Sequence, residues 1–144
     1  MQRLLIDSGP LVALFDKSDA WHAPVTAFVK DYRGQLDTSA ANITEAAWIT
    51  ASVSHQMLIN LLTWLDRGAM NVHNLESGDL GRIAALATRY RSLRPDFADL
   101  ALLALAERLK LTQIITLDER DFSVYRLRNG RPLRNVLSAR SASR

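Results

Sequence analysis

The sequence predicts an α/β domain with a central, mostly parallel sheet. Short apolar segments alternate with longer helical ones, the order expected when helices cross between parallel strands. An aspartate directly follows two of the short apolar segments: Asp7 comes after residues 4–6, and Asp118 comes after residues 114–117. The chain has 144 residues, enough for one domain, which we expect to span residues 1–137.

Local patterns give the order of the elements. We expect strands at 3–6, 35–38, 70–74 and 113–117, and helices at 10–16, 22–32, 43–52, 56–67, 77–91 and 96–109. Right-handed crossovers between such strands place successive strand ends at one edge of the sheet. Residues that follow the strands are therefore expected to lie close together.

Two helix starts carry local signals. Gly9-Pro10 opens the first helix, and a proline suits the first helical position. Asn42 is expected to cap the helix that carries Glu45, with the three-residue spacing of a reciprocal capping box. This arrangement places Glu45 in the first turn of its helix.

A third helix start precedes the most apolar segment of the chain. Asp96 suits the N-cap position, and Asp99 then lies in the first turn. Residues 100–111 are apolar nearly all round, so we expect this helix to be buried.

The C-terminal segment predicts a hairpin and a basic surface. Asn129-Gly130 lies between alternating segments at 124–128 and 131–137, which favours a β-hairpin, and Pro132 restricts the second arm to a sheet edge. Residues 122–144 carry a charge of +6, whereas the first 121 residues carry −3. We expect the hairpin to gather arginines near the last strand end, where they bind phosphate; these are Arg126, Arg128, Arg131 and Arg134.

Composition excludes several classes of protein. The absence of cysteine excludes a disulfide scaffold, a thiolate zinc site and a cysteine nucleophile. The N-terminal apolar stretch is too short for a signal peptide, and the run at 100–106 is too short to span a bilayer. We therefore expect a cytoplasmic protein without membrane contact, with a disordered, solubilising tail at 138–144.

Four acids fall where the predicted fold brings them together: Asp7, Glu45, Asp99 and Asp118. Ligands of open α/β sheets bind outside the C-terminal ends of the strands. Two carboxylates about 4 Å apart repel by roughly 4 kcal/mol near a protein surface. A divalent cation with oxygen ligands removes that repulsion, and Mg²⁺ is held by a few carboxylates together with water and phosphate.

Several of the acids also have a structural explanation. Asp7 before Gly-Pro suits a turn, and Glu45 suits a capping box. Asp96 and Asp99 together suit a helix start without any function. Asp121 can instead pair with a neighbouring arginine at the surface.

The chain resembles a known family in four segments. These segments are LIDSGPLVAL at 5–14, ITEA at 43–46, DFADLALLALA at 96–106 and ITLDERDF at 115–122. In this order and spacing they resemble the PIN domain family, closely its VapC-type toxin branch. The resemblance covers residues 3 to about 127.

The resemblance implies a three-layer α/β/α fold and an endoribonuclease that depends on Mg²⁺ or Mn²⁺. It also implies a homodimer, a small antitoxin partner and an RNA substrate cleaved by metal-activated water. Metal binding and catalysis are implied for Asp7, Glu45, Asp99 and Asp118, with Thr116 as a conserved hydroxyl and Asp96 as an extra acid found in part of the family.

Two other classes of function remain open at this point, a different phosphate enzyme and a non-catalytic domain. A haloacid-dehalogenase-like phosphatase needs a second aspartate at the position of Gly9, and a phosphoacceptor domain needs paired acids and a late lysine that are not evident. A non-catalytic RNA-binding domain with the same fold would be favoured by the loss of one acid. All four acids are present.

Overall fold

The computed structural model describes residues 2–138, and its described strands form one parallel sheet. The strands are β1 (Arg3–Ile6), β2 (Gln35–Ser39), β3 (Asn71–His73), β4 (Gln113–Ile115) and β5 (Arg134–Asn135). Their order in the sheet is β3-β2-β1-β4-β5, and every pairing is parallel. The predicted α/β class and parallel sheet are confirmed.

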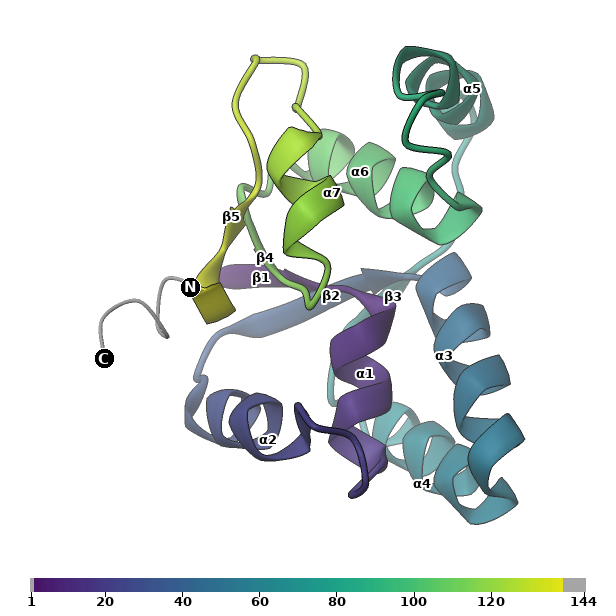
Figure 1. The fold of residues 1–144 in the computed structure, drawn as a ribbon, viewed down its shortest axis with the longest axis vertical. Coiled ribbons are helices and arrows are strands. Elements are labelled where there is room, and N and C mark those ends of the chain that lie inside the picture. The colour runs from purple at the N-terminus through teal and green to yellow at the C-terminus, as the bar shows by residue number, and fades with distance from the viewer. Residues whose placement is uncertain (1, 139–144) are drawn as a thin grey trace.

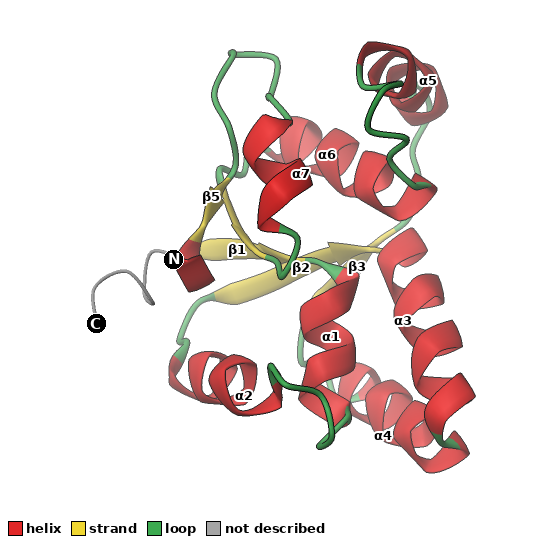
Figure 2. Ribbon diagram, viewed as in Figure 1, coloured by secondary structure: helices red, strands yellow, loops and turns green. Residues whose placement is uncertain are grey.

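Helices cover both faces of this sheet. They are α1 (Ser8–Phe15), α2 (His22–Asp31), α3 (Ala40–Val53), α4 (His55–Asp66), α5 (Asp79–Arg89), α6 (Phe97–Leu109) and α7 (Glu119–Val124). Figure 1 shows α1, α2 and α4 on one side of the sheet and α5, α6 and α7 on the other. Helix α3 contacts both α1 and α6. The three layers are also clear from the distribution of helices and strands in Figure 2.

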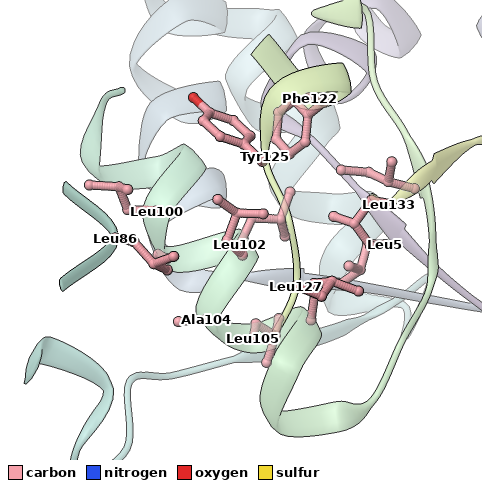
Figure 3. Packing of buried hydrophobic residues seen from close by; sticks show 14 of the residues in the cluster. Leu5, Leu86, Leu100, Leu102, Ala104, Leu105, Phe122, Tyr125, Leu127 and Leu133 are labelled. Atoms are coloured by element: carbon pink, nitrogen blue, oxygen red, sulfur yellow. The ribbon is translucent and has the colours of Figure 1, made fainter. Parts of the chain in front are cut away.

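The alternation of side chains along β1 explains the two cores. Leu4 and Ile6 pack in the core on the α1 side, whereas Leu5 lies between them and packs on the opposite face. Leu5 is paired in register with Ile114 of β4, which joins the same α6-side core. Figure 3 shows this second core, in which Leu102 of α6 lies among the labelled side chains.

Helix α6 is the most deeply buried helix of the fold. All seven residues from Leu100 to Ala106 are buried, as the apolar sequence predicts. Asp96 caps the helix by accepting a hydrogen bond from the backbone N–H of Asp99 at 2.9 Å. The predicted cap is confirmed.

Two predicted helix starts are wrong. The first helix begins at Ser8 with Asp7 as its N-cap, so Pro10 occupies the third helical position, where its missing N–H is still not needed. Helix α3 begins at Ala40, because the hydroxyl of Ser39 accepts the backbone N–H of Asn42 at 3.1 Å. Asn42 is therefore not the cap, and Glu45 lies in the second turn.

The predicted β-hairpin is also wrong. Helix α7 extends to Val124, and the chain then makes only a tight turn, closed by a 2.9 Å hydrogen bond from Leu127 N–H to the carbonyl of Arg131. Gly130 supplies the positive φ of 82° that this turn requires. Strand β5 pairs in parallel with β4 instead of folding back on residues 124–128.

The arginines of this segment do not gather at the strand end near Asp118. Arg134 is paired with Gln113 at the start of β4, and Arg128 lies 3.9 Å from Glu107 near the C-terminal end of α6. Leu127 and Leu133 are buried in the α6-side core, and they hold the turn along this helix. Arg128 and Arg134 therefore do not lie at the strand end where the sequence predicts them.

The predicted disordered tail lies outside the described residues, apart from Ser138. The hydroxyl of Ser138 accepts a hydrogen bond from the amide of Asn135 at 3.1 Å. Among the helices of residues 2–138, none is both long and apolar enough to cross a membrane.

Candidate metal centre

One pocket collects the predicted acids. It has a volume of about 530 Å³, and Asp7, Glu45, Asp96, Asp99, Asp118 and Asp121 all line it. We call it the acid pocket. The acids come from the end of β1, from α3, from the start of α6 and from the segment after β4. The strands β1 and β4 are neighbours, so their parallel pairing places the residues that follow them side by side.

Asp7 is held from three directions. Its Oδ1 accepts the backbone N–H of Ser8 at 2.8 Å and the amide of Asn42 at 3.3 Å, and its Oδ2 accepts the hydroxyl of Thr116 at 2.7 Å. The side chain is almost fully buried. The carboxylate therefore has a fixed position at the floor of the acid pocket.

Thr116 links Asp7 to Asp118. Its hydroxyl donates to Asp7 and accepts the backbone N–H of Asp118 at 3.0 Å. Asp118 in turn caps α7, since its Oδ1 accepts the N–H of Asp121 at 3.1 Å. A single buried hydroxyl thus sets the relative positions of two predicted site residues.

Asp99 is oriented by a tyrosine from the segment after α7. The hydroxyl of Tyr125 donates to Asp99 Oδ2 at 3.1 Å. Tyr125 is 1% exposed, and its ring makes edge contacts with Tyr90 and Phe122. In Figure 3 its hydroxyl points away from the apolar side chains of the core.

The closest carboxylates differ in part from the predicted set. Oxygen atoms of Asp99, Asp118 and Asp121 all lie within 4.8 Å of one another. Asp7 and Glu45 line the same pocket but do not belong to this trio. Asp121, whose sequence context favoured a surface ion pair, thus lies among the acids of the site.

Burial and mutual repulsion disfavour ionisation of these acids. Burial, with added repulsion from Asp96 and Asp118, raises the pKa of Asp7 to about 6, although hydrogen bonds from Thr116 and Ser8 oppose the shift. Burial and the charges of Asp7, Asp96 and Asp118 raise the pKa of Asp99 to about 8. The pKa of Glu45 is raised by burial and by Asp96 and Asp7, while a hydrogen bond from Ser8 lowers it.

This donor set fits a divalent cation. The pocket offers only hard carboxylate oxygens as ionisable ligands, and burial together with repulsion from neighbouring carboxylates raises the pKa of Asp7 and of Asp99. Arg94 lines the pocket but is exposed at its rim. A cation bound among these oxygens would remove the repulsion.

Sequence comparison agrees with this geometry. Residues 4–127 match the model of the PIN domain family. The chain belongs to this family. Ribonuclease VapC26 of Mycobacterium tuberculosis is 30% identical over 124 residues, which cover 85% of this chain and 92% of that protein.

Solved structures show the same PIN fold. VapC20 of Mycobacterium tuberculosis, described as a sarcin-ricin loop cleaving toxin, has a TM-score of 0.76 at 14% identity and covers 81% of this chain and 91% of its own. A toxin–antitoxin complex from Klebsiella pneumoniae has a TM-score of 0.64 at 23% identity, with 84% and 91% covered. VapBC2 of Rickettsia felis, bound to a DNA fragment from its promoter, has a TM-score of 0.60 at 12% identity, with 85% and 92% covered.

Sequence reasoning missed two residues that build this PIN-domain site. Asn42 is fully buried, and its amide donates to Ser8 Oγ at 3.0 Å as well as to Asp7. Its position three residues before Glu45 suggested a cap and concealed this role. Tyr125 gave no signal, because a tyrosine in an alternating segment is equally typical of a strand.

Proposed function

We propose that this PIN-domain protein is an endoribonuclease that cleaves RNA phosphodiester bonds with Mg²⁺ or Mn²⁺ in the acid pocket. The observation that carries the proposal is the convergence of six carboxylates from separate segments on one pocket. We assign metal binding to Asp7, Glu45, Asp96, Asp99 and Asp118, with Asp121 as a further candidate from its distances. The ribonuclease name of the 30% identical relative supports the reaction type.

The protein's own groups prepare the site for hydrolysis. A divalent cation bound here would lower the pKa of a water ligand and neutralise charge on the phosphate. Thr116 and Asn42 hold Asp7 in place, and Tyr125 holds Asp99, so the ligands need little rearrangement when a cation binds. Thr116 is therefore a positioning residue for both Asp7 and Asp118.

The test is cleavage of labelled RNA by the purified protein with Mg²⁺, with Mn²⁺ and with EDTA. We expect cleavage only with a divalent cation, and we expect Asp118→Asn to abolish it because a ligand charge is lost. Asp66→Asn is the matched control, since Asp66 is an exposed acid at the end of α4 that does not line the acid pocket. Cleavage in EDTA, or full activity of Asp118→Asn, would contradict the proposal.

We also propose that the protein is the toxin of a toxin–antitoxin pair in the cytoplasm. The name of its relative and the fold shared with toxin–antitoxin complexes support this role. Exposed apolar side chains on α4, such as Ile59 and Leu62, offer a surface for a small antitoxin or a second copy in a homodimer. An arginine of the antitoxin inserted among the carboxylates would replace the cation.

Expression in a bacterial host tests the toxin role. The wild-type protein should arrest growth, Asp118→Asn should not, and co-expression of the cognate antitoxin should restore growth. Harmless expression of folded, active protein would contradict the toxin role while leaving the nuclease activity intact.

A further inference from the structure

A second hollow lies beside the acid pocket. It has a volume of about 630 Å³, within the range of small-molecule sites. Its walls include Trp21, Leu117, Arg120 and Leu137, and we call it the side pocket. The segments that supply these residues precede α2, run from the end of β4 into α7 and follow β5, and they can be traced in Figure 1.

The two pockets share a wall. Leu117 and Asp118 line both of them, so a ligand in the side pocket lies directly beside the carboxylates of the acid pocket. Thr116, which positions Asp7 and Asp118, also lines the side pocket. An extended RNA strand with one phosphate in the acid pocket can therefore place its neighbouring nucleotide in the side pocket.

Trp21 offers an open aromatic surface in this pocket. It is 44% exposed, whereas Trp64 packs against Phe15 with ring centroids 5.6 Å apart. The segment is fixed by a 2.8 Å hydrogen bond from Trp21 N–H to Asp19 and by a 2.7 Å contact between His22 Nδ1 and the carbonyl of Ala13. The ring is thus presented from an anchored position.

The polar groups of the side pocket favour a nucleotide. Arg120 is exposed and forms no ion pair with the other residues in the 2–138 range, so its charge is available to a phosphate. Glu119 also lines the pocket, and its carboxylate opposes a free anion but accepts hydrogen bonds from exocyclic amino groups of bases. The aromatic ring, the cation and the carboxylate together match a base with its attached phosphate better than they match a base alone or a phosphate alone.

We propose that the side pocket receives an RNA base next to the cleaved phosphate, stacked on Trp21, while Arg120 contacts the adjoining phosphate. This inference rests on the proposed nuclease function and assigns a substrate subsite to it. Single-stranded RNA is recognised by stacking of unstacked bases on aromatic side chains, and every base has a face for this contact.

The test is binding of a fluorescein-labelled, random-sequence RNA of about ten nucleotides, which lies in the range of single-strand site sizes. All variants carry Asp118→Asn to prevent cleavage, and anisotropy gives Kd. We expect Trp21→Ala and Trp21→Leu to weaken binding by about 5-fold to 150-fold, the loss of one stacked base, and Trp21→Phe to retain most of it. Trp48→Ala is the control, because Trp48 is 78% exposed on α3 and lines neither pocket.

Arg120 gives an independent measurement. Arg120→Gln should reduce the slope of log affinity against log salt by about 0.7, the value for one phosphate contact on a single strand. Arg131→Gln should leave the slope unchanged, because Arg131 is an exposed arginine in the turn along α6. If neither Arg120→Gln nor Arg131→Gln changes the slope, Arg120 does not belong to the subsite.

Three results would overturn the proposal. The first is unchanged RNA affinity in Trp21→Ala, and the second is full RNA affinity in Trp21→Leu. The third is a Trp21 variant that loses affinity for the antitoxin but not for RNA, which would assign the pocket to a protein contact. If Trp21→Ala does not fold, the comparison of Trp21→Phe with Trp21→Leu still decides. If the wild-type protein cleaves RNA in a metal-dependent manner, these outcomes overturn only the subsite and leave the proposed nuclease function standing.

Discussion

Replacement of Asp99 by asparagine should stabilise the metal-free protein while abolishing cleavage. Asparagine has the same shape, and its side-chain oxygen can still accept the Tyr125 hydroxyl that now bonds Asp99 at 3.1 Å. Only the ability of the side chain to ionise is removed. The pKa of Asp99 is raised from 3.8 to about 8, chiefly by burial and then by Asp7 and Asp96.

The magnitude follows from proton linkage. Between the unfolded pKa of 3.8 and the folded pKa of about 8, the folded protein binds more protons at Asp99 than the unfolded chain, so stability falls as pH rises. A change of one in pKa corresponds to about 1.4 kcal/mol, which gives a cost of about 4 kcal/mol at about pH 7 and about 2 kcal/mol at about pH 5. The Asp99→Asn variant has no such cost. Relaxation and water penetration reduce the effect, so we expect a gain of about 2 to 4 kcal/mol at about pH 7.

Urea unfolding in EDTA at both pH values measures this difference. Asp66→Asn again serves as the control, since Asp66 is an exposed acid at the end of α4. Added Mg²⁺ should stabilise the wild-type protein more than Asp99→Asn, because only the wild type retains the full ligand set. Lower stability of Asp99→Asn than wild type, or a difference that does not grow with pH, would refute the reasoning.

Three further perturbations probe two groups at the acid pocket and one buried ion pair elsewhere in the sheet. Thr116→Val removes a donor to Asp7 and should cost about 1 to 3 kcal/mol in urea unfolding, with loss of cleavage; an unchanged stability would show that this hydroxyl is not needed. Tyr125→Phe keeps the ring packing but loses the hydrogen bond to Asp99. Calorimetry should therefore show an affinity for Mn²⁺ about 10-fold or more below that of the wild-type protein in the same buffer. Arg3→Met leaves the buried carboxylate of Asp37 without its 2.7 Å partner and should cost about 3 kcal/mol at neutral pH, less in acid where Asp37 is protonated; equal losses at both pH values would contradict this.

The acids at strand ends could be predicted from the sequence. Asp7 and Asp118 each follow an apolar run, and parallel pairing of neighbouring strands brings such positions together whatever the details of the loops. Asp96 and Asp99 could be predicted because a cap and its first turn are local features. Local chemistry and sheet topology were sufficient for these residues.

The partners of these acids depend on tertiary contacts and could not be predicted. Asn42 satisfies the rules for a cap, but Ser39 lies one turn earlier and takes that role, which frees the Asn42 amide for Asp7. The Asn129-Gly130 pair satisfies the rules for a hairpin, but burial of Leu127 and Leu133 along α6 directs the chain into β5. A local signal does not specify which of two competing partners is closer in space.

Three of the acids that line the pocket also cap helices. Asp7, Asp96 and Asp118 are the N-caps of α1, α6 and α7, and their carboxylate oxygens accept backbone N–H groups at 2.8 to 3.1 Å. Asparagine caps a helix about as well as aspartate, whereas alanine costs about 1 kcal/mol. At Asp96 and Asp118 an alanine scan therefore mixes lost folding with lost chemistry, and asparagine isolates the chemistry. At Asp7 both carboxylate oxygens accept hydrogen bonds, so asparagine also loses one of these contacts. Inactive but well-folded protein, of the kind needed to capture intact RNA, is best obtained at Asp96 or Asp118 by exchanging a single oxygen for nitrogen.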